Sequence, residues 1–454
     1  MTKSLSLGVF EILTPSNGVP TWRHPSGRGD RYGDPAYWMR LGTLLDDAGF
    51  DFLFFADSYG YPIVDGGVPD EVLEHGILFP GYDPMLLISA IAQAAPGLGL
   101  VVTSSTSLEQ PFPTARRFAS LDAFTKGRIG WNIVTGSTAQ TTEGLFGITH
   151  FPHDRRYDVA DEFVDLCRTL WEDLWDDDAV AFDRDANVLV DPAKVREVAY
   201  RGEHFSSHGL FKVPPGPQRT PVMFQAGASG RGRDFGARNA EAMFIQGQDL
   251  EQARTAVADI RARVAAAGRD PHSLKIISGA TVTVAPTRAE ALAKRAELEA
   301  LFSMDDAAVL FAGFTGIDLR ALDPSMRIAD IPPTNEGRTP LERYLDMPGI
   351  DTVADVLEAF RVQERGLVVT GAPREVAQQL VDLAEGADFD GYMLEPTFGD
   401  LGAYEDFIEL VLPELAELGA FTEPDRSLTL RERLGLGSAT PGFRPSTKNL
   451  AADA

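Results

Sequence analysis

The stretch FDFLFFAD, residues 50–57, decides the fold class. A short run this uniformly apolar is typical of a strand buried on both faces, and such strands belong to parallel sheets covered by helices. The segment before it opens with Asp34-Pro35, a good N-cap followed by proline at the first helical position. Gly49 then gives a natural helix end. The sequence therefore predicts a helix through Asp47 and, directly after it, a buried parallel strand.

The same alternation of strand and helix continues along the chain. Asp83-Pro84 repeats the helix-start signal, and a further helix is expected from Ser229. The predicted strands are residues 5–12, 50–57, 98–105, 127–136, 221–227, 241–247, 274–284 and 389–396. Eight parallel β/α units indicate an α/β fold, a closed (β/α)8 TIM barrel. An open doubly wound sheet remains the alternative, because periodicity alone does not prove closure.

Three long segments interrupt the repeat, near residues 13–33, 176–220 and 303–372. Loops of this length in a compact domain are usually functional or contain small structures of their own. We therefore expect a single TIM-barrel domain over residues 1–439 with three insertions. Residues 440–454 are polar with proline and glycine nearby, and they are expected to form an extended or partly disordered C-terminal tail.

Composition narrows the class of partner. Among 454 residues, 67 are Asp or Glu and 41 are Lys or Arg, which gives a net charge of -26. This acidity argues against nucleic-acid binding and is most simply a solubility feature. Cys167 is the single cysteine, so no intramolecular disulfide forms. Without a signal-peptide pattern, and without the roughly 20 consecutive apolar residues that a membrane helix needs, we expect a cytoplasmic protein with no membrane association.

The residues that end the predicted strands indicate the kind of site. In barrels of this type the active site lies at the carboxyl ends of the strands. Those ends are polar and hydrogen-bonding, with Asp57, Thr103, Ser104, Ser105, Asn132, Thr135, Gln225, Gln246 and Glu395 among them. Two histidine pairs, His150 with His153 and His204 with His208, lack a third ligand nearby, so no metal site is expected.

Two segments are suited to an anion. Gly227-Ala228-Ser229-Gly230 opens the helix after the fifth strand, where small residues expose backbone N–H groups and the helix dipole favours negative charge. The alternative is that Ser229 is an ordinary N-cap. The second segment begins the helix around residue 157.

This second segment is HDRRY, residues 153–157, with Asp154 as the expected N-cap. His153 and Tyr157 are four residues apart, a spacing that brings side chains to one helix face. A histidine, a tyrosine and a nearby arginine suit a phosphate; the alternative is a solvated helix start with a partly packed tyrosine. The chain has no G-x-G-x-x-G fingerprint, P-loop, H-E-x-x-H or G-x-S-x-G motif. A phosphate-binding segment without a dinucleotide-binding motif fits a barrel that binds a mononucleotide cofactor.

The string KGRIGWNIVTG, residues 126–136, resembles a hallmark of the luciferase-like family of flavin-dependent monooxygenases. The resemblance is to the branch with nitrilotriacetate, EDTA, dibenzothiophene-sulfone and long-chain alkane monooxygenases. It extends from about residue 5 to 436. Further matching strings are WRHP (22–25), YW (37–38), FDFLFFAD (50–57), DPMLLISA (83–90), HDRRYDVADEF (153–163), PQRTPVMFQAGASGRGRDFGARNAEAMF (217–244) and DGYMLEP (390–396).

The resemblance implies a bacterial luciferase-like TIM barrel that takes reduced FMN from a separate NAD(P)H-dependent flavin reductase. With O₂ as co-substrate, the reduced flavin forms a C4a-peroxyflavin and inserts one oxygen atom into a small organic substrate. Relatives are commonly homodimers or homotetramers. The flavin-contacting positions that it implies are Asp57 and Thr103 along the flavin, Asn132 near the isoalloxazine, His153 and Tyr157 at the ribityl-phosphate end, and Ala228 and Ser229 at the phosphate.

The match has departures. Ser137-Thr138 stands where alkane-oxidising members have a histidine, so no catalytic residue can be assigned here. The loop Tyr59-Gly60-Tyr61-Pro62 is particular to this chain and is expected to shape the substrate pocket. Two other functions stay open: an F420-dependent oxidoreductase on the same barrel, and a non-catalytic flavin-binding paralogue.

Overall fold

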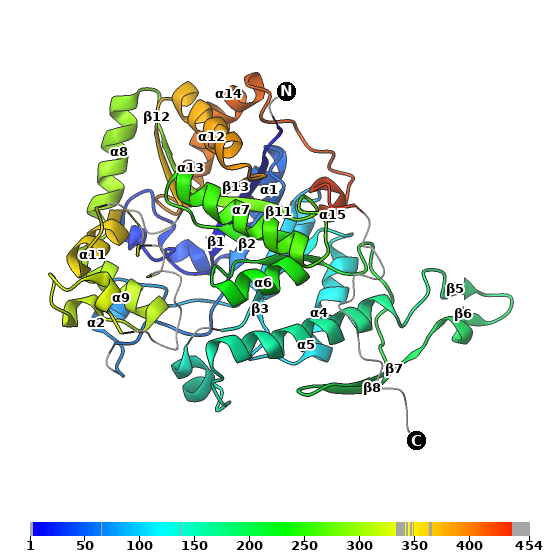
Figure 1. Ribbon diagram of the computed structural model, residues 1–454. Coiled ribbons are helices and arrows are strands. Elements are labelled where there is room, and N and C mark those ends of the chain that lie inside the picture. Colours follow the sequence, from blue (N-terminus) through cyan, green and yellow to red (C-terminus); the bar gives the residue numbers. More distant parts are fainter. Residues whose placement is uncertain are drawn as a thin grey trace.

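Eight parallel strands form a closed barrel in the computed structural model (Figure 1). The structure describes residues 3–64, 66–136, 138–332, 341, 344–345, 347, 349–362 and 366–437. The barrel strands are β1 (Ser6–Ile12), β2 (Phe52–Ala56), β3 (Gly99–Ser105), β4 (Ile129–Val134), β9 (Val222–Gln225), β10 (Ala242–Ile245), β11 (Lys275–Val284) and β13 (Gly391–Glu395). Each predicted strand is present. The pairing of β10 with β11 closes the ring, so the TIM barrel is confirmed and the open sheet is wrong.

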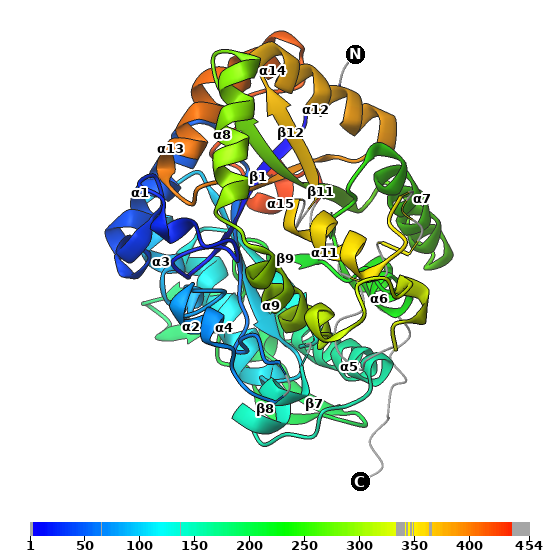
Figure 2. The same cartoon turned by 90° about the vertical axis from the view of Figure 1, so that its left-hand side faces the viewer.

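Helices surround the barrel, as Figure 2 shows from a second side. They are α1 (Pro35–Asp47), α3 (Ile88–Ala94), α4 (Pro111–Phe124), α5 (His153–Glu172), α6 (Gly230–Asn239), α7 (Leu250–Ala266), α8 (Arg288–Ala300), α12 (Pro373–Ala387), α13 (Leu401–Asp406) and α14 (Leu412–Glu417). The caps predicted at Asp34 and Ser229 are present: Asp34 accepts a hydrogen bond from the Ala36 N–H at 2.9 Å, and Ser229 caps α6. Among the described residues no helix has the length and apolar character that crossing a bilayer requires.

Two apolar layers hold the barrel together. One lies between the strands and the helices, and the other fills the barrel interior with aromatic rings. Inside, Phe10 stacks on Phe54 with ring centroids 5.8 Å apart. The short helix α15 (Leu430–Arg433) adds Leu430 to the interior and bonds to the Gly127 carbonyl, just before β4 begins. The amino-terminal end of the barrel is therefore packed, and the opposite end is left for ligands.

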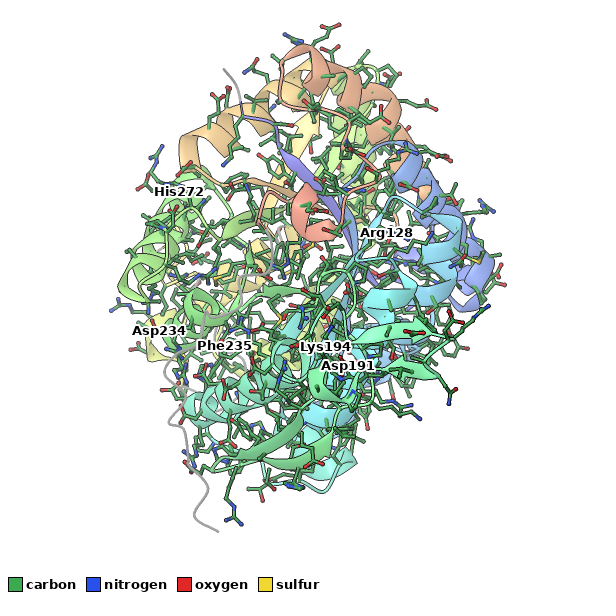
Figure 3. The ribbon with its side chains drawn as sticks, turned by 90° about the vertical axis from the view of Figure 1, so that its right-hand side faces the viewer. Arg128, Asp191, Lys194, Asp234, Phe235 and His272 are labelled. Atoms are coloured by element: carbon green, nitrogen blue, oxygen red, sulfur yellow. The ribbon has the colours of Figure 1, made fainter. Side chains whose placement is uncertain are left out.

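Arg128 fastens this packed end (Figure 3). Its guanidinium is buried and donates to the carbonyl oxygens of Ala95 and Leu98, at 2.8 and 2.6 Å. Those carbonyls belong to the turn between α3 and β3. A buried arginine with this many acceptors satisfies backbone groups that the turn would otherwise leave unpaired.

The three interrupting segments contain small structures. Residues 13–33 carry two 3₁₀ turns, η1 (Thr21–Arg23) and η2 (Gly29–Gly33). Residues 176–220 form two hairpins, β5 (Val180–Asp183) with β6 (Val188–Val190) and β7 (Glu197–Arg201) with β8 (Ser206–Leu210), and Figure 1 shows them projecting from the barrel. The third segment has α9 (Met304–Thr315) and α11 (Val353–Val362), which share a second apolar core with the short α2 (Asp70–Glu74).

Some local predictions need correction. The helix expected from Tyr157 begins at His153, and its N-cap residue is Pro152, not Asp154. Asp154 instead accepts a hydrogen bond from His153. The helix expected from Asp83 is split into a 3₁₀ turn, η3 (Pro84–Leu86), and α3. Strand β12 (Leu367–Gly371) was not predicted; it pairs in parallel with β11 outside the barrel ring. The C-terminal tail, residues 440–454, lies outside the described residues.

Candidate active site

A cavity of about 290 Å³ opens at the carboxyl ends of four neighbouring strands, β2, β3, β4 and β9. This is the end of the barrel where the sequence predicted a site. The lining residues include Asp57, Ser58, Tyr59, Asp83, Thr103, Ser105, Glu109, Arg117, Thr135, Thr141, Thr142, Tyr157, Gln225, Ala226 and Gly227. A cavity of this size can bury a large part of a mononucleotide.

One end of the cavity reaches the N-terminus of α6. The Ser229 hydroxyl accepts a hydrogen bond from the Gly232 N–H at 3.1 Å, so the N-cap interpretation is correct. The turn before it is packed too tightly for any side chain at Gly227, where a Cβ would lie 2.2 Å from Gln225 Nε2 and 2.9 Å from the Tyr157 hydroxyl. The absence of side chains here leaves the backbone N–H groups of a ten-residue helix accessible to an anion.

Tyr157 connects this turn to the cavity. Burial raises the pKa of its hydroxyl, while hydrogen bonds with Ser229 and Thr135 oppose that shift. Its ring packs on Phe235 of α6, with centroids 5.6 Å apart; Phe235 is labelled in Figure 3. A neutral tyrosine held this way is a hydrogen-bond donor next to the α6 N-terminus.

His153 lies beside Tyr157, edge to face, with ring centroids 5.4 Å apart. Its Nδ1 is 2.7 Å from the Asp154 carboxylate. The histidine is outside the set of residues that line the cavity. It supports the Tyr157 ring and stands near the predicted ribityl-phosphate end of the site.

The floor of the site is a hydrogen-bonded pair on adjacent strands. Thr103 donates to the Phe55 carbonyl at 2.8 Å, and Asn132 Nδ2 donates to Thr103 Oγ1 at 2.9 Å. Asn132 is 4 % exposed, and its Oδ1 has no partner among the described residues. A buried acceptor without a partner is costly unless a ligand supplies a donor. The ring N–H groups of a reduced flavin are donors of that kind, so the residues present fit FMN.

Carboxyl groups gather at the other end of the cavity. Burial, together with the nearby Asp83 and Glu109, raises the pKa of Asp57 to about 7. Glu109 accepts hydrogen bonds from Ser104 Oγ at 2.7 Å and from Arg117 Nη1 at 2.8 Å. Asp57 therefore holds or releases a proton close to neutral pH.

The structure brings most of the predicted site residues together. Asp57, Thr103 and Tyr157 line one cavity. Asn132, Ala228 and Ser229 are not among its lining residues: Asn132 donates to the lining Thr103, and Ala228 and Ser229 follow the lining Gly227 in the chain. Glu395, at the end of β13, faces a separate cavity of about 60 Å³, and Gln246 lines neither cavity. Ser137 lies outside the described residues. Across the part of the chain that the structure describes, no three His, Cys, Asp or Glu side chains are grouped as a metal site would need.

Three charged lining residues were missed from the sequence: Asp83, Glu109 and Arg117. None of them directly ends a strand. Asp83 gave a signal only as the N-cap of the next helix, a role it does fill by accepting from the Met85 N–H at 2.8 Å. The expected contribution of the Tyr59 loop is present, because Tyr59 lines the cavity.

Fold and site together define a class: an α/β-barrel enzyme with a cavity suited to a phosphorylated, hydrogen-bonding cofactor at the strand ends. The sequence profile of the luciferase-like monooxygenases matches residues 16–391. The chain belongs to this family and is a monooxygenase.

Similar proteins agree with this placement. The chain is 37 % identical to a long-chain alkane monooxygenase of Geobacillus thermodenitrificans, over 96 % of this chain and 94 % of that protein. It is 36 % identical to a dimethyl-sulfide monooxygenase of Hyphomicrobium sulfonivorans, over 96 % and 91 %. A solved riboflavin lyase, with modified FMN and substrate riboflavin, superposes with a TM-score of 0.91 at 41 % identity, covering 97 % of both chains. The branch expected from the sequence is confirmed.

The F420 alternative is not favoured. An F420-dependent secondary alcohol dehydrogenase superposes with a TM-score of 0.56 at 13 % identity. That likeness shows a shared fold and nothing about the cofactor of this chain.

Proposed function

We propose that this monooxygenase binds reduced FMN, supplied by a separate NAD(P)H-dependent flavin reductase, and uses O₂ to insert one oxygen atom into a small organic substrate. The observation that carries the proposal is the α6 turn, where Gly227, Ser229 and the Tyr157 hydroxyl pack together at the helix N-terminus beside the cavity. When bound, reduced FMN supplies the electrons that activate O₂.

Different residues of the chain would hold the phosphate, the ribityl chain and the ring system of the cofactor. Ala228 and Ser229 offer the phosphate the α6 N-terminus, and Tyr157, supported by His153, donates at the ribityl-phosphate end. Thr103 and Asn132 orient the ring system from the barrel floor. The Asn132 amide Oδ1, which has no partner among the described residues, would accept from a flavin N–H.

Asp57 and the aromatic interior set the conditions for the chemistry. The Asp57 carboxyl, with its pKa near 7, can hold a proton next to the flavin and pass it on without a large energetic cost. Below the site, stacked rings such as Phe10 and Phe54 leave little room for water. A dry floor limits unproductive loss of the activated oxygen.

The test is an anaerobic titration with reduced FMN, followed by O₂ and a panel of candidate substrates, with products identified by mass spectrometry and ¹⁸O₂. The proposal predicts one ¹⁸O atom in the product and dependence on reduced FMN. Binding of reduced F420 in place of FMN would support the alternative oxidoreductase. Tight FMN binding without O₂ consumption would support a non-catalytic flavin protein.

A second candidate concerns the substrate. The riboflavin lyase is 41 % identical to this chain, whereas the alkane and dimethyl-sulfide monooxygenases are 37 % and 36 % identical. Riboflavin is therefore the first substrate to try. Loss of riboflavin in the presence of FMN, a flavin reductase, NADH and O₂ would support it. Unchanged riboflavin alongside oxidation of an alkane or a sulfide would reject it.

We also propose a cytoplasmic homodimer or homotetramer, as the family resemblance implies. The net charge of -26 suits a soluble protein. Light scattering of the purified chain separates the two assemblies from a monomer.

A further inference from the structure

We propose that the active-site cavity selects aromatic substrates that carry no negative charge. The residues that make this selection are Tyr59, Asp83 and Glu109, at the β2–β3 end of the cavity. The proposal deepens the proposed function and rests on it in one respect: the α6 end is taken to hold the cofactor phosphate and the strand ends at Asp57 and Thr103 its ring, which leaves the mouth beside Tyr59, Asp83 and Glu109 for the substrate. In the order of the strands, β9 and β2 are the two ends of the four-strand arc around the cavity.

The charge of the β2–β3 end is negative. The residues that line the cavity include three carboxyl groups, from Asp57, Asp83 and Glu109, and one basic side chain, Arg117. Arg117 is engaged by Glu109 at 2.8 Å, so that pair is close to neutral. Asp57 and Asp83 have no ion pair to a basic side chain among the described residues. An anionic substrate would therefore meet like charge from Asp83, which is exposed at the mouth, and from the half-buried Asp57.

The influence of these carboxylates is visible in their neighbours. Asp83 and Glu109 both raise the pKa of Asp57, and all three carboxylates raise the pKa of the Tyr59 hydroxyl beyond the effect of burial. Arg117 lowers the pKa of the Tyr59 hydroxyl and so opposes the carboxylates at that residue. The negative potential thus extends over the same volume in which a substrate would lie.

The mouth beside these carboxylates is aromatic. The rings of Tyr59 and Phe146 meet edge to face with centroids 5.0 Å apart. We call these two residues the aromatic lip. Tyr59 is 48 % exposed and Phe146 38 % exposed. Phe146 directly follows the π-helical turn η4 (Gln140–Leu145), whose Thr141 and Thr142 line the cavity.

Exposed apolar side chains continue from the lip along the same loop. Leu145, Ile148 and Phe151 are 46 %, 40 % and 39 % exposed. An exposed apolar group at the mouth of a cavity is typical of a ligand-binding surface, and aromatic rings favour planar partners. The cavity therefore has an aromatic entrance beside a negative wall.

The test compares three naphthalene probes of nearly equal size: naphthylmethanol, naphthylmethylamine and naphthoate. Each is titrated by equilibrium dialysis onto the full chain, with saturation by oxidised FMN measured first. We expect naphthoate to bind at least about tenfold more weakly than the alcohol, and the amine to bind no more weakly than the alcohol. In Asp83→Asn, naphthoate should approach the affinity of the alcohol. Tyr59→Ala should weaken all three probes alike, because it removes a stacking surface and no charge.

Asp185→Asn, in the exposed turn between β5 and β6, is the matched control and should change none of the affinities. Equal affinity of naphthoate and the alcohol in the unmodified protein would overturn the proposal, as would an unchanged preference in Asp83→Asn or binding of none of the probes. FMN binding is read separately. If FMN does not bind, the proposed function fails, while the probe preference is still measured on the FMN-free chain.

Discussion

Replacing Ser229 by alanine tests the phosphate end of the site by removing one hydroxyl. That hydroxyl caps α6 through the Gly232 N–H and contacts Tyr157. Loss of an N-cap costs about 1 kcal/mol of stability. For a chain of 454 residues the unfolding entropy is roughly 1 kcal/mol/K, so the melting temperature should fall by only about 1 °C.

The effect on FMN should be much larger than the effect on the fold. A hydrogen bond to a charged phosphate contributes about 1.5–3 kcal/mol, so the Kd of FMN should rise about ten- to a hundredfold. The assay is an anaerobic equilibrium titration with reduced FMN, paired with reduced riboflavin, which has the same ring system and no phosphate. Only the FMN affinity should fall.

Ser303→Ala is the matched control, because Ser303 caps α9 in the same way and belongs to an insertion that does not line the cavity. It should lower the melting temperature by a similar amount and leave FMN binding unchanged. Equal losses of FMN and riboflavin affinity in Ser229→Ala would refute the phosphate assignment. So would an unchanged Kd for FMN.

Three further predictions address the turn, the acid and the first insertion. Gly227→Ala places a Cβ 2.2 Å from Gln225 Nε2 and should abolish FMN binding in the same titration. Gly230→Ala is the control, because its Cβ meets no atom within 4 Å, and it should leave FMN binding unchanged. Asp57 has its pKa raised from 3.8 to about 7, so the folded state binds the extra proton between these values and its stability falls as pH rises through that window. Asp57→Asn should therefore raise the free energy of unfolding by up to about 4 kcal/mol at pH 8 and by almost nothing near pH 4, as measured by thermal melts. An equal increase at both pH values would contradict the raised pKa of Asp57. Arg28→Met should lower the free energy of unfolding by about 3–5 kcal/mol in denaturant melts, because the buried Glu11 carboxylate, 2.6 Å from Arg28, is left without its cation. Adding Glu11→Gln to the Arg28→Met chain should restore part of this stability. No recovery in the double variant would contradict a role for the ion pair.

Much of the barrel was predictable because its local signals agree with its global arrangement. The run 50–57 is apolar on both faces because β2 lies between the barrel interior and the helix layer. Asp34 and Ser229 are caps in sequence and in structure. The closed barrel was predicted from the number of β/α units, but the open sheet could not be excluded, since closure depends on the pairing of β10 with β11, which the hydrophobic pattern does not encode. Strand β12 was missed because it lies in an insertion and pairs outside the ring.

Site residues were predictable where they lie at the carboxyl end of a strand. Thr103 and Asn132 are register partners on β3 and β4, which is why two residues 29 positions apart share a hydrogen bond. Asp83 and Glu109 were missed because they lie in loops that fold over the strand ends. No local sequence pattern predicts that a loop residue will line the cavity. Asp154 was misassigned because an acidic residue near a helix start resembles a cap even when the preceding proline already holds that position.

The most direct test of the central claim is a rapid-mixing experiment on the protein with bound reduced FMN. The chain is loaded anaerobically, mixed with oxygenated buffer, and followed by the absorbance of oxidised flavin. The account predicts that the bound flavin returns to the oxidised form distinctly more slowly than free reduced FMN, because the cavity shields it from water and holds it through Asn132 and Tyr157. Reoxidation at the rate of free flavin, or no binding of reduced FMN, would contradict it.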